Sequence, residues 1–146
     1  MSPVPDSQRR PSLERDPFPT PPVTVAVAAR SDRGRQREGN EDALVVAHLG
    51  AREAWFSSCQ RALTAPSGQL LLAVCDGMGG EAGGEVASRL AALAIERSMR
   101  ERAPRTADEV ERALVDAVLD ASRVVRDAAR EPSLTRMGST ATVACV

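Results

Sequence analysis

Two acidic groups in the sequence combine residue types and spacing that could do chemistry. Glu41 and Asp42 precede an apolar run at 43–49, and Asp76, followed by Gly77, ends another at 69–75. In a hairpin-like pair, the start of one strand lies beside the end of the next, so we expect Glu41, Asp42 and Asp76 to meet. Three carboxylates this close stay ionised only if a cation neutralises them. Ligation by oxygen alone favours Mg²⁺ or Mn²⁺ over zinc.

Gly77 and Arg37 extend this candidate metal centre. A residue without a Cβ lets its backbone carbonyl approach an ion, and the glycines after Gly77 let the chain turn sharply, although glycines with only a turn function would look the same. Arg37 lies four residues before Glu41. Its guanidinium could hold a phosphate bidentately beside the metals, whereas an arginine in a polar loop is more often solvated surface.

A nucleotide site is an alternative interpretation of the glycine cluster. Residues 77–84 follow a strand and precede a helix, as in dinucleotide-binding turns. However, Asp76 and Glu81 place negative charge where a pyrophosphate would lie, and the sequence has no lysine for a phosphate-binding loop of the Walker type. A ribose-recognising acid at the end of a following strand would also be needed, and we expect helix there. The residues favour metal over nucleotide.

Apolar periodicity and turn residues predict the elements that carry these groups. Residues 23–29 alternate as in a half-buried strand, and 30–40 form a polar loop. The stretch from 50 to 68 has no regular pattern, so we expect a hairpin with an unusually long connection between strands 43–49 and 69–75. A helix follows from Glu85. Thr106 and Glu109 form a capping box that opens a second helix, which Pro132 ends. Residues 138–146 form a last strand.

This order of elements predicts an α+β fold with mainly antiparallel sheets, because strands and helices do not alternate as in a doubly wound sheet. The first helix has apolar residues on two sides, so we expect more than one covered face. The second helix has one apolar stripe, made of Val110, Leu114, Ala117, Ala121 and Val124. The charged residues Glu96, Arg97, Arg100 and Glu101 are expected to be solvated surface.

Composition excludes several functional classes. The 146 residues have a net charge of -1, which gives no large field toward nucleic acid or an acidic membrane. No apolar run is long enough to span a bilayer. The three cysteines lack C-x-x-C spacing, which favours a reducing, cytoplasmic setting. The proline-rich residues 1–22 are predicted to be a disordered leader before a domain at 23–146.

The remaining aromatic, histidine and thiol groups have structural interpretations. His48 is the sole histidine and enters no mechanism. Trp55 and Phe56 are expected either to pack back onto the sheet or to form a docking patch. Cys75, beside Asp76, is expected to be an inert buried thiol.

Four motifs occur in an order that resembles the PPM-type (type 2C) metal-dependent protein serine/threonine phosphatases, bacterial members above all. They lie at residues 31–43, 74–80, 84–88 and 137–141. The resemblance runs from about residue 23 to the last residue. It implies part of an α-β-β-α sandwich, namely the amino-terminal portion of the phosphatase domain, with a metal centre of two Mn²⁺ or Mg²⁺ ions at one edge of the paired sheets.

The resemblance also implies roles for individual residues. Asp76 would bridge the two ions, Gly77 would lend its carbonyl, and Glu41 and Asp42 would hold ions or their waters. Arg37 falls on the phosphate-binding arginine of the family. The implied reaction is hydrolysis of phosphoserine and phosphothreonine in phosphorylated protein substrates by a metal-activated water, with a serine/threonine kinase as a possible partner.

Two departures from the family pattern qualify this expectation. Met78 stands where some members have a histidine proposed as general acid, and a metal-bound water could serve instead. The later metal-binding aspartates of the family have no counterpart here, since no aspartate follows Asp127. The alternative hypothesis is therefore a noncatalytic fragment or phosphoprotein-binding module with an incomplete metal site.

Overall fold

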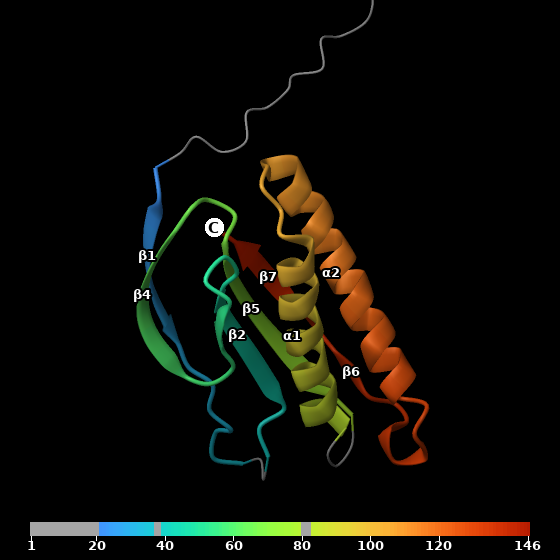
Figure 1. Ribbon diagram of the computed structural model, residues 1–146. Coiled ribbons are helices and arrows are strands. Elements are labelled where there is room, and N and C mark those ends of the chain that lie inside the picture. The colour runs from blue at the N-terminus through green and yellow to red at the C-terminus, as the bar shows by residue number, and fades with distance from the viewer. Residues whose placement is uncertain (1–20, 37–38, 80–82) are drawn as a thin grey trace, which may run out of the picture.

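The computed structural model describes residues 21–36, 39–79 and 83–146. Two helices pack on one face of an antiparallel sheet, and a two-stranded sheet lies against the other face (Figure 1). This arrangement confirms the predicted α+β class. The elements are β1 (Val23–Ala29), β2 (Asp42–His48), β3 (Glu53–Trp55), β4 (Cys59–Ala65), β5 (Leu70–Met78), α1 (Gly83–Arg102), α2 (Ala107–Ala128), a 3₁₀ turn (Pro132–Leu134), β6 (Gly138–Ser139) and β7 (Thr142–Cys145).

The larger sheet is built around β5. Strand β2 pairs with β5 along its whole length, β3 pairs with the outer edge of β2, and β6 and β7 together cover the other side of β5. All of these pairs are antiparallel, as expected. Because β5 is paired on both sides, both of its backbone edges are satisfied and its position is fixed from two directions.

The connection at 50–68 differs from the expectation of a long irregular link. It contains β3, which pairs with β2 in the larger sheet, and β4, which pairs with β1 in a second, two-stranded sheet. Strand β4 gives little signal in the sequence because Gln60, Arg61 and Ala62 are exposed and only Leu63 and Ala65 are buried. These two buried residues pack with the inner face of the larger sheet.

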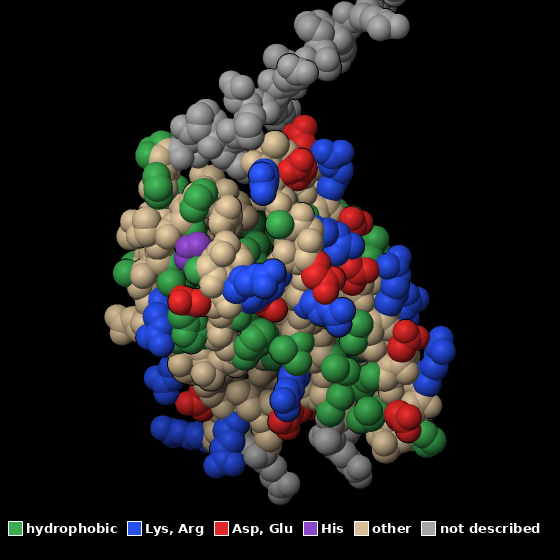
Figure 2. All heavy atoms as spheres, viewed as in Figure 1, with side chains coloured by type: hydrophobic (Ala, Val, Ile, Leu, Met, Phe, Trp, Pro, Cys, Tyr) green, Lys and Arg blue, Asp and Glu red, His purple; other side chains and the backbone are tan. Residues whose placement is uncertain are grey.

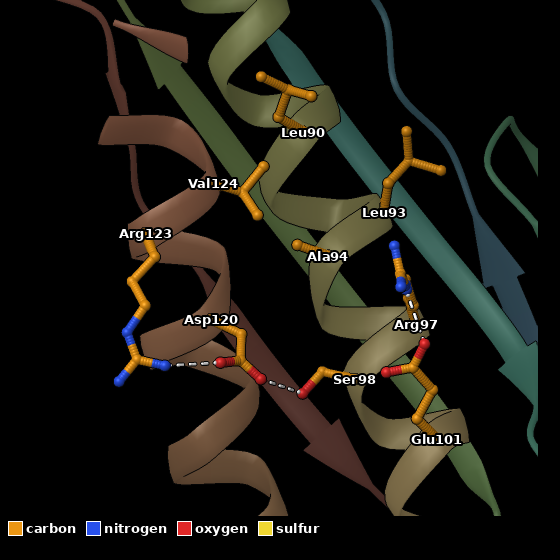
Figure 3. Close-up of a pocket in the computed structure, with 9 residues that line it drawn as sticks. All are labelled: Leu90, Leu93, Ala94, Arg97, Ser98, Glu101, Asp120, Arg123 and Val124. Carbon is orange, nitrogen blue, oxygen red and sulfur yellow. Dashed lines mark hydrogen bonds and ion pairs between the residues drawn. The ribbon is translucent and has the colours of Figure 1, made fainter. Parts of the chain in front are cut away.

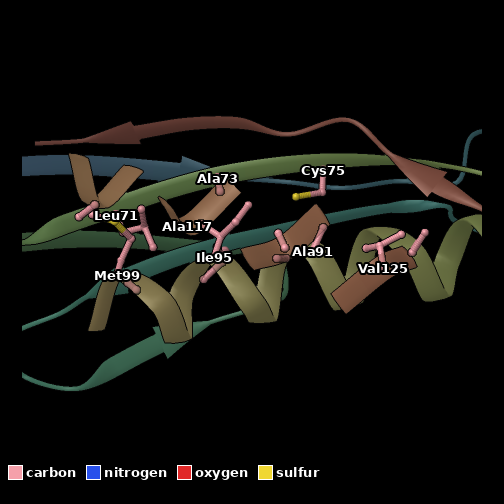
Figure 4. Packing of buried hydrophobic residues seen from close by; sticks show 14 of the residues in the cluster. Leu71, Ala73, Cys75, Ala91, Ile95, Met99, Ala117 and Val125 are labelled. Atoms are coloured by element: carbon pink, nitrogen blue, oxygen red, sulfur yellow. The ribbon is translucent and has the colours of Figure 1, made fainter. Parts of the chain in front are cut away.

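The main core lies between the larger sheet and the two helices. Figure 4 shows Leu71, Ala73 and Cys75 of β5 directed toward residues of α1 and α2. Side chains alternate along a strand, so these odd-numbered residues share the helix face of β5. Leu71 and Cys75 are completely buried. Helix α1 is covered by both the sheet and α2, which confirms that it has more than one covered side.

The buried face of α2 is rotated relative to the predicted apolar stripe. It consists of Ala113, Ala117, Ala121 and Val125, whereas Val124 is 40% exposed. Small alanines at this face let α2 pack closely, and Val115, Val118, Leu119 and Val124 are exposed outside the contact. The predicted start is correct, since Thr106 and Glu109 form the complete capping box.

Glu96 corrects the expectation of a fully solvated charged face on α1. It is only 9% exposed, and its carboxylate accepts hydrogen bonds from the guanidinium of Arg100 one turn later. Arg97 and Glu101 form an exposed ion pair, as expected for surface residues. A buried carboxylate requires such a partner, because an unpaired buried charge is strongly unfavourable.

A polar contact links α1 to α2 on the outer side of the helix pair. The Ser98 hydroxyl donates to Asp120 Oδ2 at 2.9 Å, and Arg102 and Arg123 also contact the Asp120 carboxylate. This contact closes one end of a groove of about 420 Å³, which Leu90, Leu93 and Val124 line on its apolar side (Figure 3). The hydrogen bond from Ser98, followed by the charges of the two arginines, holds the pKa of Asp120 below its ordinary value.

We predict that Asp120→Asn lowers the melting temperature at neutral pH. The folded pKa is depressed, so the ionised carboxylate stabilises the fold above the unfolded pKa of about 4, and this contribution is lost as the pH falls further. The difference in melting temperature between the variant and the wild type should therefore be present at pH 7 and shrink as the pH falls through the lowered pKa of Asp120. Thermal melts followed by circular dichroism measure it. Glu111→Gln, which removes one charge from an exposed position on α2, is the control, and an equal effect of both variants would contradict the prediction.

A smaller cluster fills the space between the two sheets. It is formed by Val46, Leu63, Ala65 and Leu70, with Trp55 packed against it. The indole of Trp55 also lies 5.2 Å from the guanidinium of Arg61. Trp55 thus packs back onto the sheet, one of the two alternatives stated for it, while Phe56 remains 41% exposed.

His48 is also structural. Its Nδ1 accepts from the Ala51 backbone N–H at 3.1 Å, which leaves Nε2 to donate to the Thr64 carbonyl at 3.1 Å. The imidazole thus links β2 to β4.

In the part of the chain that the structure describes, no helix combines the length and apolar character needed to cross a bilayer.

Candidate metal centre

Asp42 and Asp76 lie directly opposite each other at one end of the larger sheet. Asp42 is the first residue of β2, and the antiparallel register pairs its Cα with that of Asp76 near the end of β5. The sequence predicted this juxtaposition from the ends of the two apolar runs. Residues opposite each other in a sheet point to the same face, so the two carboxylates are neighbours.

The backbone hydrogen bonds bring these two side chains closer than average. The N–H of Asp76 donates to Thr140 Oγ1, and its C=O accepts from Thr140 N, so both groups point away from β2. Asp42 and Asp76 therefore form a non-hydrogen-bonded pair, the type in which side chains approach most closely, with Cβ atoms about 5 Å apart. Like charges directly opposite each other are unfavourable, and a cation between them would remove that repulsion.

Glu41 differs in one respect from the expected arrangement. The Gly77 N–H donates to the Glu41 carbonyl at 3.0 Å, which makes Glu41 and Gly77 the next pair along the ladder. Side chains alternate between faces, so Glu41 lies on the helix face, where its carboxylate is next to Gly84 at the start of α1. Two of the three predicted carboxylates thus share a face. Among the described residues, no group of three or more His, Cys, Asp and Glu side chains is arranged to hold a metal ion.

Gly77 is required by close packing at the same point. A Cβ at Gly77 would lie 1.9 Å from the Gly84 carbonyl oxygen and 2.7 Å from the Glu41 carbonyl oxygen. Both obstacles are backbone atoms, which cannot rotate away as a side chain can. Gly77 therefore does more than permit a turn, because its missing side chain lets the start of α1 lie against the end of β5.

We predict that Gly77→Ala lowers the free energy of unfolding by at least about 2 kcal/mol, because the methyl group has no space without a backbone shift. Gly39→Ala is the matched control, since a Cβ at Gly39 meets nothing within 4 Å. Urea denaturation of both variants measures the difference. Equal stability of Gly77→Ala and the wild type would show that α1 can move away from β5 at little cost.

Ser139 and Thr140 support Asp76, and reasoning from the sequence gave them no role. Thr140 makes two hydrogen bonds to the backbone of Asp76, of 3.1 and 2.8 Å, and Ser139 Oγ lies 3.2 Å from the Asp76 carbonyl oxygen. The Gly-Ser-Thr motif that contains them was recognised as a resemblance. Its function as a backbone clamp follows from the pairing of β6 with the end of β5.

Met137, immediately before this clamp, lies against Gly79 and Gly83. A Cβ at Gly79 would lie 3.0 Å from Met137 Cα, and one at Gly83 would lie 3.3 Å from Met137 Cβ. Met137 is buried and belongs to the main core. Residues 137–140 thus contact both the Asp76 backbone and Gly83, the first residue of α1.

We predict that Thr140→Val lowers the free energy of unfolding by about 1 kcal/mol, the net value of one hydrogen bond, because the Asp76 N–H loses its acceptor. Thr140→Ser keeps the hydroxyl and should lose less. Urea denaturation of the two variants tests this, and identical stabilities would mean that the hydroxyl does not hold Asp76.

Arg37, the predicted phosphate ligand, lies outside the described residues. Cys75 faces the core beside Asp76, and burial raises the pKa of its thiol to about 11. The thiolate, which is the reactive form, is therefore scarce at neutral pH, in agreement with an inert buried cysteine.

The donor set fits a hard divalent cation better than a soft one. Asp42 and Asp76 are exposed at the sheet end, and they offer carboxylate oxygens, which suit Mg²⁺ and Mn²⁺. Neither sulfur nor imidazole takes part, because Cys75 points into the core and His48 lies at the opposite end of β2.

The chain belongs to the protein phosphatase 2C family. The model of that family matches residues 57–146, which is more than half of the chain and includes β4, β5, both helices and the Gly-Ser-Thr segment. The resemblance inferred from the sequence motifs is thereby confirmed.

Relatives from Mycobacterium tuberculosis support the same assignment. The chain is 41% identical over 73 residues to the serine/threonine protein phosphatase PstP of two strains of that organism, CDC 1551 / Oshkosh and ATCC 25618 / H37Rv. The match covers 50% of this chain and 10% of the length of that protein. The crystal structure of the M. tuberculosis phosphatase PstP/Ppp is similar with a TM-score of 0.55 and 28% identity, over 86% of this chain and 42% of that chain.

Proposed function

We propose that the chain forms the amino-terminal part of a metal-dependent phosphatase that hydrolyses phosphoserine and phosphothreonine in proteins. Family membership supports the reaction class. The observation that carries the proposal is the opposed pair of Asp42 and Asp76, because two adjacent carboxylates at an open sheet end are suited to a divalent cation.

The proposed roles follow the positions of the residues in the fold. Asp76, fixed from both sides of β5, would bind both Mn²⁺ or Mg²⁺ ions, and Asp42 would bind one of them or its water. Gly77 would contribute its carbonyl, and Glu41, whose carboxylate lies next to Gly84 on the helix face, would bind an ion or its water at the strand end. Cations held there would lower the pKa of bound water and neutralise phosphate charge.

Phosphate recognition is assigned to Arg37 in this proposal. It precedes Glu41 by four residues on the connection that leads into β2. A guanidinium can bind two phosphate oxygens at once and so orient the phosphoryl group toward the attacking water. Attack by water breaks the bond between phosphorus and the side-chain oxygen, so the products are inorganic phosphate and the serine or threonine residue with its hydroxyl restored.

The proposed setting is cytoplasmic, with phosphorylated proteins as substrates. All three cysteines are free, which is consistent with a reducing compartment. The substrates require a serine/threonine kinase to produce them, and we propose such a kinase as a functional partner.

We predict that the chain releases phosphate from a phosphothreonine peptide only with added Mn²⁺ or Mg²⁺, and that Asp76→Asn lowers the rate at least about 100-fold, the upper end of the cost of losing a supporting group at a metal site. Asp108→Asn, an exposed carboxylate on α2, is the control and should keep the activity. A phosphate-release assay measures all three proteins. Retained activity in Asp76→Asn, or activity without metal, would contradict the proposal.

A noncatalytic phosphoprotein-binding module is the second candidate. One observation favours it: among the described residues, no group of three or more His, Cys, Asp and Glu side chains is arranged to hold a metal ion. Calorimetric titration with Mn²⁺ separates the two candidates. Tight binding of two ions supports the enzyme, and the absence of binding together with Mn²⁺-independent capture of a phosphopeptide supports the module.

A further inference from the structure

The connection between β1 and β2 carries a concentrated positive charge. Arg30, Arg33 and Arg35 are exposed, and Asp32 is the one acid within residues 30–36, so this segment has a net charge of +2. The whole chain has a net charge of -1, so the excess is local. Blue side chains gather at the lower left of Figure 2, where Figure 1 draws this connection. We call residues 30–36 the arginine loop.

Internal contacts shape the arginine loop. Gly34 has a φ of +73° and donates its N–H to Asp32 Oδ1 at 2.9 Å, which fixes a turn. The other Asp32 oxygen forms an ion pair with Arg30 Nη2 at 3.1 Å. The hydrogen bond from Gly34 and the adjacent Arg30 lower the pKa of Asp32.

Further hydrogen bonds tie the base of the loop to the candidate metal centre. Asn40 donates from Nδ2 to Ser31 Oγ at 2.7 Å, and its Oδ1 accepts from the N–H of Asp42 at 3.2 Å. Ser31 also donates its backbone N–H to Ser58 Oγ at 3.2 Å, which attaches the loop to the segment before β4. One asparagine thus connects the start of the loop to the first residue of the opposed carboxylate pair.

We propose that the arginine loop is a substrate-docking surface that selects protein segments with acidic residues next to the phosphorylated side chain. This inference rests on the proposed function. A phosphate directed at the Asp42 and Asp76 end brings its flanking residues past the loop, where aspartates and glutamates meet guanidinium groups. Nucleic acid fits less well, because such ligands need several spread phosphate contacts and here the positive surface is one short loop beside two carboxylates.

Peptide binding tests this surface independently of catalysis. Two fluorescent peptides carry the same non-hydrolysable phosphonate analogue of phosphothreonine, flanked either by aspartate and glutamate or by asparagine and glutamine. Fluorescence anisotropy with the full chain and Mn²⁺ gives both affinities. We expect the acidic peptide to bind about fivefold tighter, the effect of two modest exposed ion pairs, and this preference to decrease with added salt.

Variants assign the preference to the loop. The double variant Arg33→Gln with Arg35→Gln should reduce the ratio of affinities to less than about twofold. Replacement of both residues by lysine should retain the preference, because the charge is kept. Arg112→Gln, an exposed arginine near the start of α2, removes the same charge far from the loop and should change nothing.

The inference would be overturned by equal affinity for the two peptides, by an unchanged preference in the glutamine variant, or by no binding of either peptide. A non-phosphorylated acidic peptide that binds as tightly as its phosphonate form would also overturn it, because docking would then be unrelated to the phosphate. Failure of the proposed function would be seen in a different experiment, the phosphate-release assay, as a lack of metal-dependent activity. The two failures are therefore distinguishable.

Discussion

The close contact between the end of β5 and the start of α1 is the constraint on which the rest of the structure depends. At Gly77 and Gly84 the two backbones are too near to admit a single methyl group. This contact sets where α1 begins relative to the sheet, and so determines which residues of α1 face the core. It also places the Glu41 carboxylate against the helix start. The contact between Gly77 and Gly84 therefore determines both how α1 packs on the sheet and where the Glu41 carboxylate of the candidate site lies.

Strand β5 serves two purposes through the alternation of its side chains. Its odd-numbered residues, Leu71, Ala73 and Cys75, form the floor of the core beneath the helices, whereas Asp76 lies on the opposite face between the exposed Val74 and Met78. A register shift of one residue would bury Asp76 and expose Cys75. The free energy gained by burying Leu71, Ala73 and Cys75 fixes the register of β5, and this register keeps the Asp76 carboxylate exposed.

Much of this arrangement could be predicted from the sequence, because strong apolar runs ended at acidic residues. The opposition of Asp42 and Asp76 followed from two such run ends, and the start of α2 followed from the capping box at Thr106 and Glu109. Strand β4 could not be found, because a peripheral two-stranded sheet buries too few side chains to leave a pattern. The clamp by Thr140 depends on a contact between residues 64 positions apart, which local patterns do not contain. Glu41 and Asp42 are consecutive, so strand alternation places them on opposite faces, which the expectation that all three carboxylates meet did not take into account.

The position of Thr140 has a consequence for how the chain is made. Asp76 obtains its partner on one side from β2, which precedes it, but on the other side from a residue 64 positions later. At synthesis rates of about 5–20 residues per second, several seconds separate the two on the ribosome. Until then β5 is an apolar edge strand with unpaired backbone groups, the kind of edge that other chains can join. We therefore expect the nascent chain to pass through an aggregation-prone stage that ends only when residues 138–146, which cover this edge of β5, have emerged.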